Sequence, residues 1–201
     1  MFISGGTPAL RNQAGRELEI VHVGIPSGKA IGTYEGLEGP AVKIAQSVDS
    51  KYLFGICVRQ PGSTPTLAAW DLTSGRPLWH FKPAKGEPEL GTIAISKDGL
   101  VAVAWGPEAY VFEAKDGKAV ATLDSSRKAV RSISFDPDSK RVWTVCGDNK
   151  IRVYEIATGK LAQTIEYGYA AWYDNQVLFR QGKPILMGFA DYGVEEIPLD
   201  D

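Results

Sequence analysis

The sequence repeats itself with a period in the low forties. Four turns each combine a small or polar residue, a glycine and a basic residue, and their glycines are Gly28, Gly75, Gly117 and Gly159. The successive spacings are 47, 42 and 42 residues. A period of this length is the sequence signature of a repeat architecture, and it constrains the fold more than any local pattern does. Glycine at one register suits tight hairpins, because it adopts a positive φ at no steric cost.

Each repeat unit has the pattern of four short strands. In the clearest unit, apolar and polar residues alternate in short runs, and Gly, Asp, Asn and Pro occupy the turns between them. The strands of this unit are expected at residues 130–135, 141–146, 151–156 and 160–165. Four antiparallel strands in about 42 residues form one blade of a β-propeller.

The neighbouring units align with this one, and the sequence predicts an all-β propeller of about five blades in a single domain. The expected blades are residues 1–36, 37–83, 84–125, 126–166 and 167–201, and the first strand of the last blade is expected at residues 176–179. The three middle blades are complete, whereas the first lacks its innermost strand and the last its outermost strand. Two outcomes stay open for these ends. They close a ring within the monomer, which we favour because five blades suffice to curve round, or the open arc pairs with a second copy.

The repeat unit resembles a WD repeat. Trp70-Asp71 stands where that family carries its Trp-Asp pair, and an aromatic residue followed by an acid recurs at Phe112-Glu113 and Tyr154-Glu155. Asp148 and Asp191 resemble the turn aspartate of the family. No Gly-His dipeptide precedes a first strand, so the buried His-Ser-Asp-Trp relay of strict WD repeats cannot form. The resemblance implies a divergent, bacterial WD-repeat-like propeller, similar to planctomycete-type WD repeats.

Residues 69–79 also resemble the tryptophan-docking motif of quinoprotein propellers, in which the last Trp docks between blades. Trp79 occupies that place, but Ala121 and Gln163 occupy it in the next two units. A quinoprotein dehydrogenase needs a longer chain and calcium-binding carboxylates. The resemblance therefore leaves a ligand-binding or enzymatic propeller as the alternative function.

Little in the sequence points to catalysis or to metal binding. His22 and His80 are the two histidines, and they fall in adjacent blades with no second ligand at a suitable spacing. Cys57 and Cys146 fall two blades apart, which argues against a disulfide. No nucleophile elbow, phosphate-binding glycine loop or zinc-binding helix motif occurs. We expect no catalytic residue, no metal and no cofactor.

Net charge and hydropathy limit the kinds of partner that the sequence predicts. The 22 Lys and Arg residues nearly balance the 24 Asp and Glu residues, and a net charge of −2 does not predict binding to nucleic acid or to a membrane surface. No apolar run is long enough to span a bilayer. No signal peptide is visible, which leaves the location open and favours the cytoplasm. The expected innermost strands supply only Lys43 and Arg131 as charged groups for a central channel.

The expected function is that of a non-catalytic scaffold for protein–protein interaction. An aromatic cluster lies in the connection from an outer strand to the next inner strand, at Tyr167, Tyr169, Trp172 and Tyr173. Such connections open on one face of a propeller, where aromatic side chains make binding anchors, although these residues could instead pack between blades. Two long loops, residues 12–16 and 60–65, project from the opposite face. The expected partner is another protein or a second copy of the chain, and a fragment of a larger multidomain WD-repeat protein is a further alternative.

Overall fold

The computed structural model describes most of the chain, in ten segments. These segments are residues 2–4, 20–23, 27, 29–34, 41–57, 66–83, 91–123, 128–167, 173–190 and 193–199. Their regular structure is entirely β-strand. None of these residues belongs to a helix that could cross a membrane.

The described residues form eighteen strands in five sheets. The first sheet contains β1 (Phe2–Ser4), β2 (Ile20–Val23) and β3 (Ala30–Tyr34); the second contains β4 (Ala41–Gln46), β5 (Tyr52–Cys57), β6 (Thr66–Asp71) and β7 (Pro77–Phe81); the third contains β8 (Thr92–Ile95), β9 (Leu100–Trp105), β10 (Glu108–Glu113) and β11 (Ala119–Leu123); the fourth contains β12 (Val130–Phe135), β13 (Arg141–Cys146), β14 (Lys150–Glu155) and β15 (Leu161–Glu166); the fifth contains β16 (Tyr173–Arg180), β17 (Lys183–Ala190) and β18 (Gly193–Pro198). Within each sheet, every strand pairs antiparallel with the next strand along the chain.

This arrangement confirms the predicted propeller pattern. Three four-stranded sheets lie between two three-stranded sheets in the described part of the chain. The strand β1 lies against β4, as β9 lies against β12 and β13 against β16. Since β9 and β13 are the second strands of their sheets, this contact fits β1 as the second strand of a blade that lacks its first.

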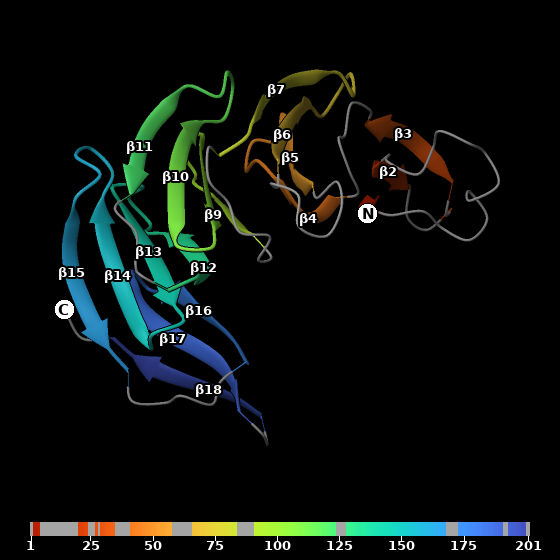
Figure 1. Cartoon of the computed structure of the whole chain (residues 1–201). Coiled ribbons are helices and arrows are strands. Elements are labelled where there is room, and N and C mark those ends of the chain that lie inside the picture. Colours follow the sequence, from red (N-terminus) through yellow and green to blue (C-terminus); the bar gives the residue numbers. More distant parts are fainter. Residues whose placement is uncertain are drawn as a thin grey trace.

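The five sheets follow one another along an open arc (Figure 1). The first sheet, in red and orange, lies at one end of the arc, and the fifth sheet, in blue, lies at the other. The first and last sheets do not meet, so the preference for ring closure within the monomer was wrong for this structure. Closure depends on the angle between successive blades summed over the whole arc, and a strand pattern carries no information about that angle.

The second strand of each complete sheet is buried along nearly its whole length. The strands β5, β9 and β13 have five consecutive buried residues each, after a first residue that is partly or fully exposed. A continuous apolar run is typical of a strand that is covered on both faces. The outermost strands β7, β11 and β15 are instead largely exposed. The repeat therefore places its most apolar strand between the two neighbouring blades.

Apolar side chains fill the space between neighbouring sheets, and we call each packed layer a junction, numbered along the chain. The first junction includes Ile20, Tyr34, Leu53 and Trp70; the second includes Phe54, Leu67, Val103, Trp105 and Phe112; the third includes Ala102, Ala104, Val111, Leu123 and Val142; the fourth includes Trp143, Val153, Tyr167, Val177 and Leu186. The hydrophobic core is thus divided among the junctions, and each sheet depends on its neighbours for burial.

The repeated glycines are required twice over. Gly75, Gly117 and Gly159 have φ angles of 70°, 70° and 69°, the left-handed region expected from the turn pattern. Each glycine also lies against the outer strand of the preceding sheet. A Cβ atom would come within 2.9 Å of a backbone oxygen at Gly75 and Gly159, and within 2.6 Å of the Trp79 ring at Gly117. The fourth turn glycine, Gly28, lies outside the described residues.

Trp79 docks between the second and third sheets. Its indole lies over Gly117, and its Nε1 donates a hydrogen bond to the backbone oxygen of Ala114 at 3.0 Å. At the first junction, Tyr34 Oη donates to the equivalent backbone oxygen of Leu72 at 3.1 Å. The single tryptophan-docking motif in the sequence therefore corresponds to a real contact between blades.

Candidate functional site

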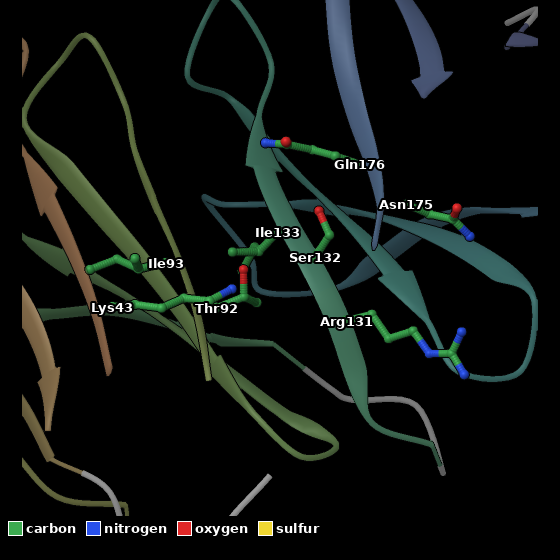
Figure 2. Close-up of a pocket in the computed structure, with 8 residues that line it drawn as sticks. All are labelled: Lys43, Thr92, Ile93, Arg131, Ser132, Ile133, Asn175 and Gln176. Carbon is green, nitrogen blue, oxygen red and sulfur yellow. The ribbon is translucent and has the colours of Figure 1, made fainter. Parts of the chain in front are cut away.

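A polar cavity of about 250 Å³ lies on the innermost strands of the arc, along β4, β8, β12 and β16 (Figure 2). The residues that line it are Lys43, Thr92, Ile93, Arg131, Ser132, Ile133, Asn175 and Gln176. We call this cavity the central pocket. It joins four of the five sheets, so its shape depends on the packing of three junctions.

Three of the polar residues occupy the same register position in successive blades. Lys43 pairs with Ile56, Thr92 with Ala104, and Ser132 with Val145. Each of these partners is the residue before the last in the second strand of its sheet. The repeat therefore directs an ammonium group and two hydroxyl groups towards one pocket from three neighbouring strands. Figure 2 shows the Lys43 side chain reaching towards Thr92.

Arg131 enters the pocket through a β-bulge. The register between β12 and β13 shifts between Val130 and Ser132, which leaves Arg131 without a Cα partner. A bulge redirects a side chain that would otherwise follow the alternation of the strand. A Cβ atom at Gly147 would lie 3.6 Å from Nε of Arg131, so this side chain lies beside the turn between β13 and β14.

Asn175 supplies an amide whose oxygen is unsatisfied. The residue is 3% exposed, and its Nδ2 donates to Tyr167 Oη at 3.3 Å. Its Oδ1 is buried without a hydrogen-bond partner. A half-turn of the amide would let Tyr167 donate to Oδ1 and would leave the NH₂ group for a ligand, since an amide carries a donor and an acceptor at similar positions. A buried polar atom without a partner costs free energy that a ligand can recover.

Electrostatic effects link Tyr167 to the pocket. Burial raises the pKa of Tyr167, whereas the hydrogen bond from Asn175 and the positive charge of Arg131 act in the opposite direction. The hydroxyl group is therefore neutral at physiological pH and can either donate to or accept from Asn175.

The pocket carries positive charge without compensating carboxylates. Its eight lining residues include Lys43 and Arg131 but no Asp, Glu, His or Cys. Within the described segments, neither base forms an ion pair. Elsewhere in the same segments, bases do have carboxylate partners: Arg152 binds Asp148 through two hydrogen bonds of 3.0 and 2.6 Å, and Arg141 Nε binds Glu155 at 2.8 Å. The central pocket can therefore bind an anionic group.

The predicted aromatic cluster is only partly described. Tyr167 is 6% exposed and packs in the fourth junction with Trp143 and Val177, so it offers little surface to a partner. Tyr173 is the first residue of β16, where it pairs with Phe189, and not part of the connection as expected. Tyr169 and Trp172 lie outside the described residues. The binding role of this segment stays a prediction.

The residues that carry the WD resemblance form repeating turn structures. Trp70, Phe112 and Tyr154 are buried and precede Asp71, Glu113 and Glu155 at the ends of β6, β10 and β14. The Asp71 carboxylate accepts hydrogen bonds from the backbone N and the Oγ of Ser74 at 2.7 and 2.8 Å, which lowers the pKa of Asp71. Asp148 binds Arg152 on its own hairpin. Asp191 lies outside the described residues.

The histidines and cysteines do not gather at a site. His80 is exposed on the outer strand β7, and the side chain of His22 lies outside the description. Cys57 and Cys146 are buried at equivalent ends of β5 and β13 and are not joined by a disulfide. Among the described residues, no three His, Cys, Asp or Glu side chains form a cluster that could hold a metal ion.

A second cavity, of about 510 Å³, lies at the first junction between β3 and the turn that follows β6. Its lining residues are Gly32, Thr33, Tyr34, Leu72, Thr73, Ser74 and Gly75. None of them carries a charge at neutral pH. The central pocket is the stronger candidate site, because it combines charged groups from different sheets with a buried unsatisfied polar atom.

The sequence predicted the two charged residues of the central pocket but not the rest of its lining. Lys43 and Arg131 were the two charged groups expected on innermost strands. The contribution of β16 was missed, because a strand was expected only from Gln176 onwards. The register shift between Tyr173 and Gln176 breaks the alternation that marks a strand. The hydroxyl groups of Thr92 and Ser132 were detectable only by aligning the register of the repeats.

Comparison with known proteins identifies the fold. No protein-family profile and no curated protein sequence matches the chain. Solved structures do match: the computationally designed Ika8 protein has a TM-score of 0.67 at 18% identity, over 90% of this chain and 52% of that one. The RRP9 WD40 repeats match with a TM-score of 0.64 at 18% identity, over 82% of this chain and 52% of that one. The structure of U3-55K matches with a TM-score of 0.63 at 20% identity, over 81% of this chain and 50% of that one. The chain thus has a WD-repeat-like propeller fold and spans about half the length of these structures.

Proposed function

We propose that this chain is a non-catalytic, WD-repeat-like interaction scaffold, and that its central pocket contacts a protein partner. The observation that carries the proposal is the composition of the pocket. It gathers two cations and several neutral hydrogen-bonding groups from four strands, and its lining residues include no Asp, Glu, His, Cys or Tyr. Such a lining supports recognition of a partner over its chemical transformation.

The size of the pocket supports a protein partner over a small molecule. Small-molecule sites usually measure roughly 300–1,000 Å³. The central pocket, at about 250 Å³, suits one or two side chains of a polypeptide. The remaining contact area would come from the strands and turns around it, since a specific protein interface buries about 800 Å² on each partner.

The alternative is a ligand-binding or enzymatic propeller of the quinoprotein type. The docked Trp79 is the feature that favours it. The same contact also has a purely structural role, because it joins two blades. A purified protein that carried calcium or a quinone, seen by metal analysis and by visible absorption, would favour this alternative over the scaffold.

Site-specific photo-crosslinking tests the scaffold. A photoreactive amino acid replaces Gln176, which is exposed at the pocket, and in a control it replaces Lys140, which is exposed at the other end of β12. We expect a discrete protein adduct from position 176 and none from position 140. The adduct's protein is then purified and titrated by calorimetry, where a stoichiometric complex supports the proposal. Equal crosslinking at both positions, or no complex with the purified protein, would refute it.

Two further proposals concern the ends of the arc. The open arc supports a homodimer in which the terminal sheets of two copies meet. The chain covers about half the length of the matched structures, which equally supports the proposal that it is a fragment of a larger WD-repeat protein. Light scattering distinguishes them: a dimer mass favours pairing of copies, and a monomer mass favours a fragment whose missing blades lie elsewhere in the same polypeptide.

A further inference from the structure

We infer that the central pocket recognises an acidic segment of its protein partner, with one anionic side chain bound beside Lys43 and another beside Arg131. The inference rests on the proposed scaffold function and names the chemistry of its partner. It is carried by the charge of the pocket, the shared register of its donors and the unsatisfied amide of Asn175.

The first anionic subsite lies at the register position shared by three blades. The Lys43 ammonium group and the hydroxyl groups of Thr92 and Ser132 all project from this position into the pocket. Thr92 and Ser132 are 6% and 9% exposed, so their hydroxyl groups are shielded from bulk water. A carboxylate or phosphate beside Lys43 can accept hydrogen bonds from its ammonium group and from the hydroxyl group of the neighbouring Thr92, and a charge-assisted bond is about twice as strong as a neutral one.

The second subsite lies beside β16. Arg131 is exposed, and Figure 2 shows its guanidinium group on the same side of β12 as Asn175. After a half-turn of the Asn175 amide, its NH₂ group becomes a second donor for an anion, while Tyr167 satisfies Oδ1. With an anion bound to the NH₂ group and Tyr167 bound to Oδ1, both polar groups of the Asn175 amide would have a hydrogen-bond partner.

Spacing between these subsites favours a segment over a single small anion. Lys43 comes from β4 and Arg131 from β12, with β8 between them. Neighbouring innermost strands are separated by a blade junction, so one carboxylate cannot reach both bases by short hydrogen bonds. An extended peptide with acidic side chains can place a separate anionic group at each base.

Fluorescence anisotropy with labelled peptides tests this inference. The probes are a fluorescein-labelled hexaglutamate, a hexaglutamine with the same label, and a phosphoserine peptide in a glycine-serine background. Lys43→Gln and Arg131→Gln each remove one pocket charge. Lys97→Gln and Lys140→Gln are the matched controls, since both residues are exposed in turns at the other end of the innermost strands and each loses the same charge.

We expect hexaglutamate to bind and hexaglutamine not to bind. Each pocket variant should weaken binding by about tenfold, because a charge-assisted hydrogen bond is lost, and each control should change it by less than about twofold. Higher salt should weaken binding further, since it screens partly exposed charges. Tighter binding of the phosphoserine peptide would identify phosphate as the preferred anion, and tighter binding of hexaglutamate would identify carboxylate.

Several results would overturn the inference. They are equal binding of hexaglutamine, no binding of either anionic peptide, or an equal loss in the control variants, with circular dichroism showing that all variants fold. A partner that crosslinks at position 176 but binds Lys43→Gln and Arg131→Gln with unchanged affinity overturns the acidic segment and leaves the scaffold intact. Peptide binding without any protein adduct supports the anionic pocket and refutes the scaffold.

Discussion

The second and third junctions join equivalent sheets with different side chains. The second is aromatic: Trp79 lies 5.9 Å from Phe54 and from Phe112 between ring centroids, and Phe81 lies 4.7 Å from Phe112. The third is built mainly from small and aliphatic residues such as Ala102, Ala104 and Val111. One position accounts for much of the contrast, because Trp79 of β7 corresponds to Ala121 of β11 in strand register.

The contrast shows which features the repeat fixes and which it leaves free. Both junctions keep a positive-φ glycine against the preceding outer strand, and both keep a buried second strand. The side chains that fill the gap vary in size, and the atoms that lie nearest to the turn glycine vary with them. At Gly159 the nearest atom to a Cβ would be the backbone oxygen of Thr122, whereas at Gly117 it would be the Trp79 ring. The polar register of the innermost strands stays in place across both junctions.

The largest effect is expected for Trp79→Ala. The substitution removes a half-buried indole from its contacts with Phe54, Phe112 and Gly117, and it deletes the hydrogen bond to Ala114. We expect a loss of about 3 kcal/mol in the free energy of unfolding, measured by urea denaturation. Ala121→Gly, at the equivalent position of β11, should cost less than about 1 kcal/mol. Equal losses would mean that the aromatic packing contributes nothing particular to the second junction.

The next prediction separates the two reasons for glycine at position 117. Gly117→Ala should cost about 2–3 kcal/mol, from the positive φ and from the overlap of its Cβ with the Trp79 ring. In the Trp79→Ala background the overlap disappears, so only about 1 kcal/mol of backbone strain should remain. A double-mutant cycle measures this coupling. Additive losses would show that Trp79 does not restrict the turn.

Sequence analysis predicted the repeated elements better than the irregular ones. The strand β13 was placed at residues 141–146, as observed, and β14 and β15 were displaced by one residue. These strands have clear alternation or a continuous apolar run, and turns rich in Gly, Asp and Asn bound them. The strand β16 was expected to begin at Gln176 but begins at Tyr173. Its register shift hides three residues from any rule based on a period of two, and with them Asn175 of the central pocket.

The central pocket could be predicted only in its charged residues. Lys43 and Arg131 stand out because they are the charged residues of the expected innermost strands. Thr92 and Ser132 do not stand out, since hydroxyl residues are common on strands, and they gain significance only from sharing a register with Lys43. The open arc was beyond sequence analysis, because it reflects small rotations between blades that no single residue determines.

The third prediction asks whether the third junction can take the side chain of the second. In Ala121→Trp, the indole would have to lie between β11 and the Gly159 turn. The backbone oxygen of Thr122 in β11 is so close to this turn that it would lie 2.9 Å from a Cβ atom added at Gly159. A ring added at this contact would overpack the junction, so we expect a loss of about 2 kcal/mol, measured by thermal and urea denaturation. Ala121→Ser is the control, because it replaces the alanine at the same position by a residue of similar size. An unchanged or increased stability would mean that the junctions are interchangeable and that the contrast between them is accidental.

The smallest effect concerns an ion pair within the fourth sheet. Asp148 and Arg152 are 22% and 15% exposed at their side chains and form two hydrogen bonds within one hairpin, whereas the second sheet has no charged residue in β5 or at the start of β6. The hydrogen bonds from Arg152 lower the pKa of Asp148 in the folded state. We expect Asp148→Asn to cost about 1 kcal/mol at pH 7.

The dependence of that cost on pH distinguishes the ion pair from a merely local turn effect. Because the folded-state pKa of Asp148 is depressed, its contribution is fully present above the unfolded pKa of about 3.9 and is lost as the pH falls through the folded value. Urea denaturation of the wild type and of Asp148→Asn at pH 7, 5 and 3 should give a difference that is constant between pH 7 and 5 and shrinks at pH 3. Measuring the difference between the two proteins cancels the titration of the other carboxylates. A difference that stays the same at pH 3 would assign the cost to turn geometry. The ionised pair would then contribute nothing to the free energy of unfolding.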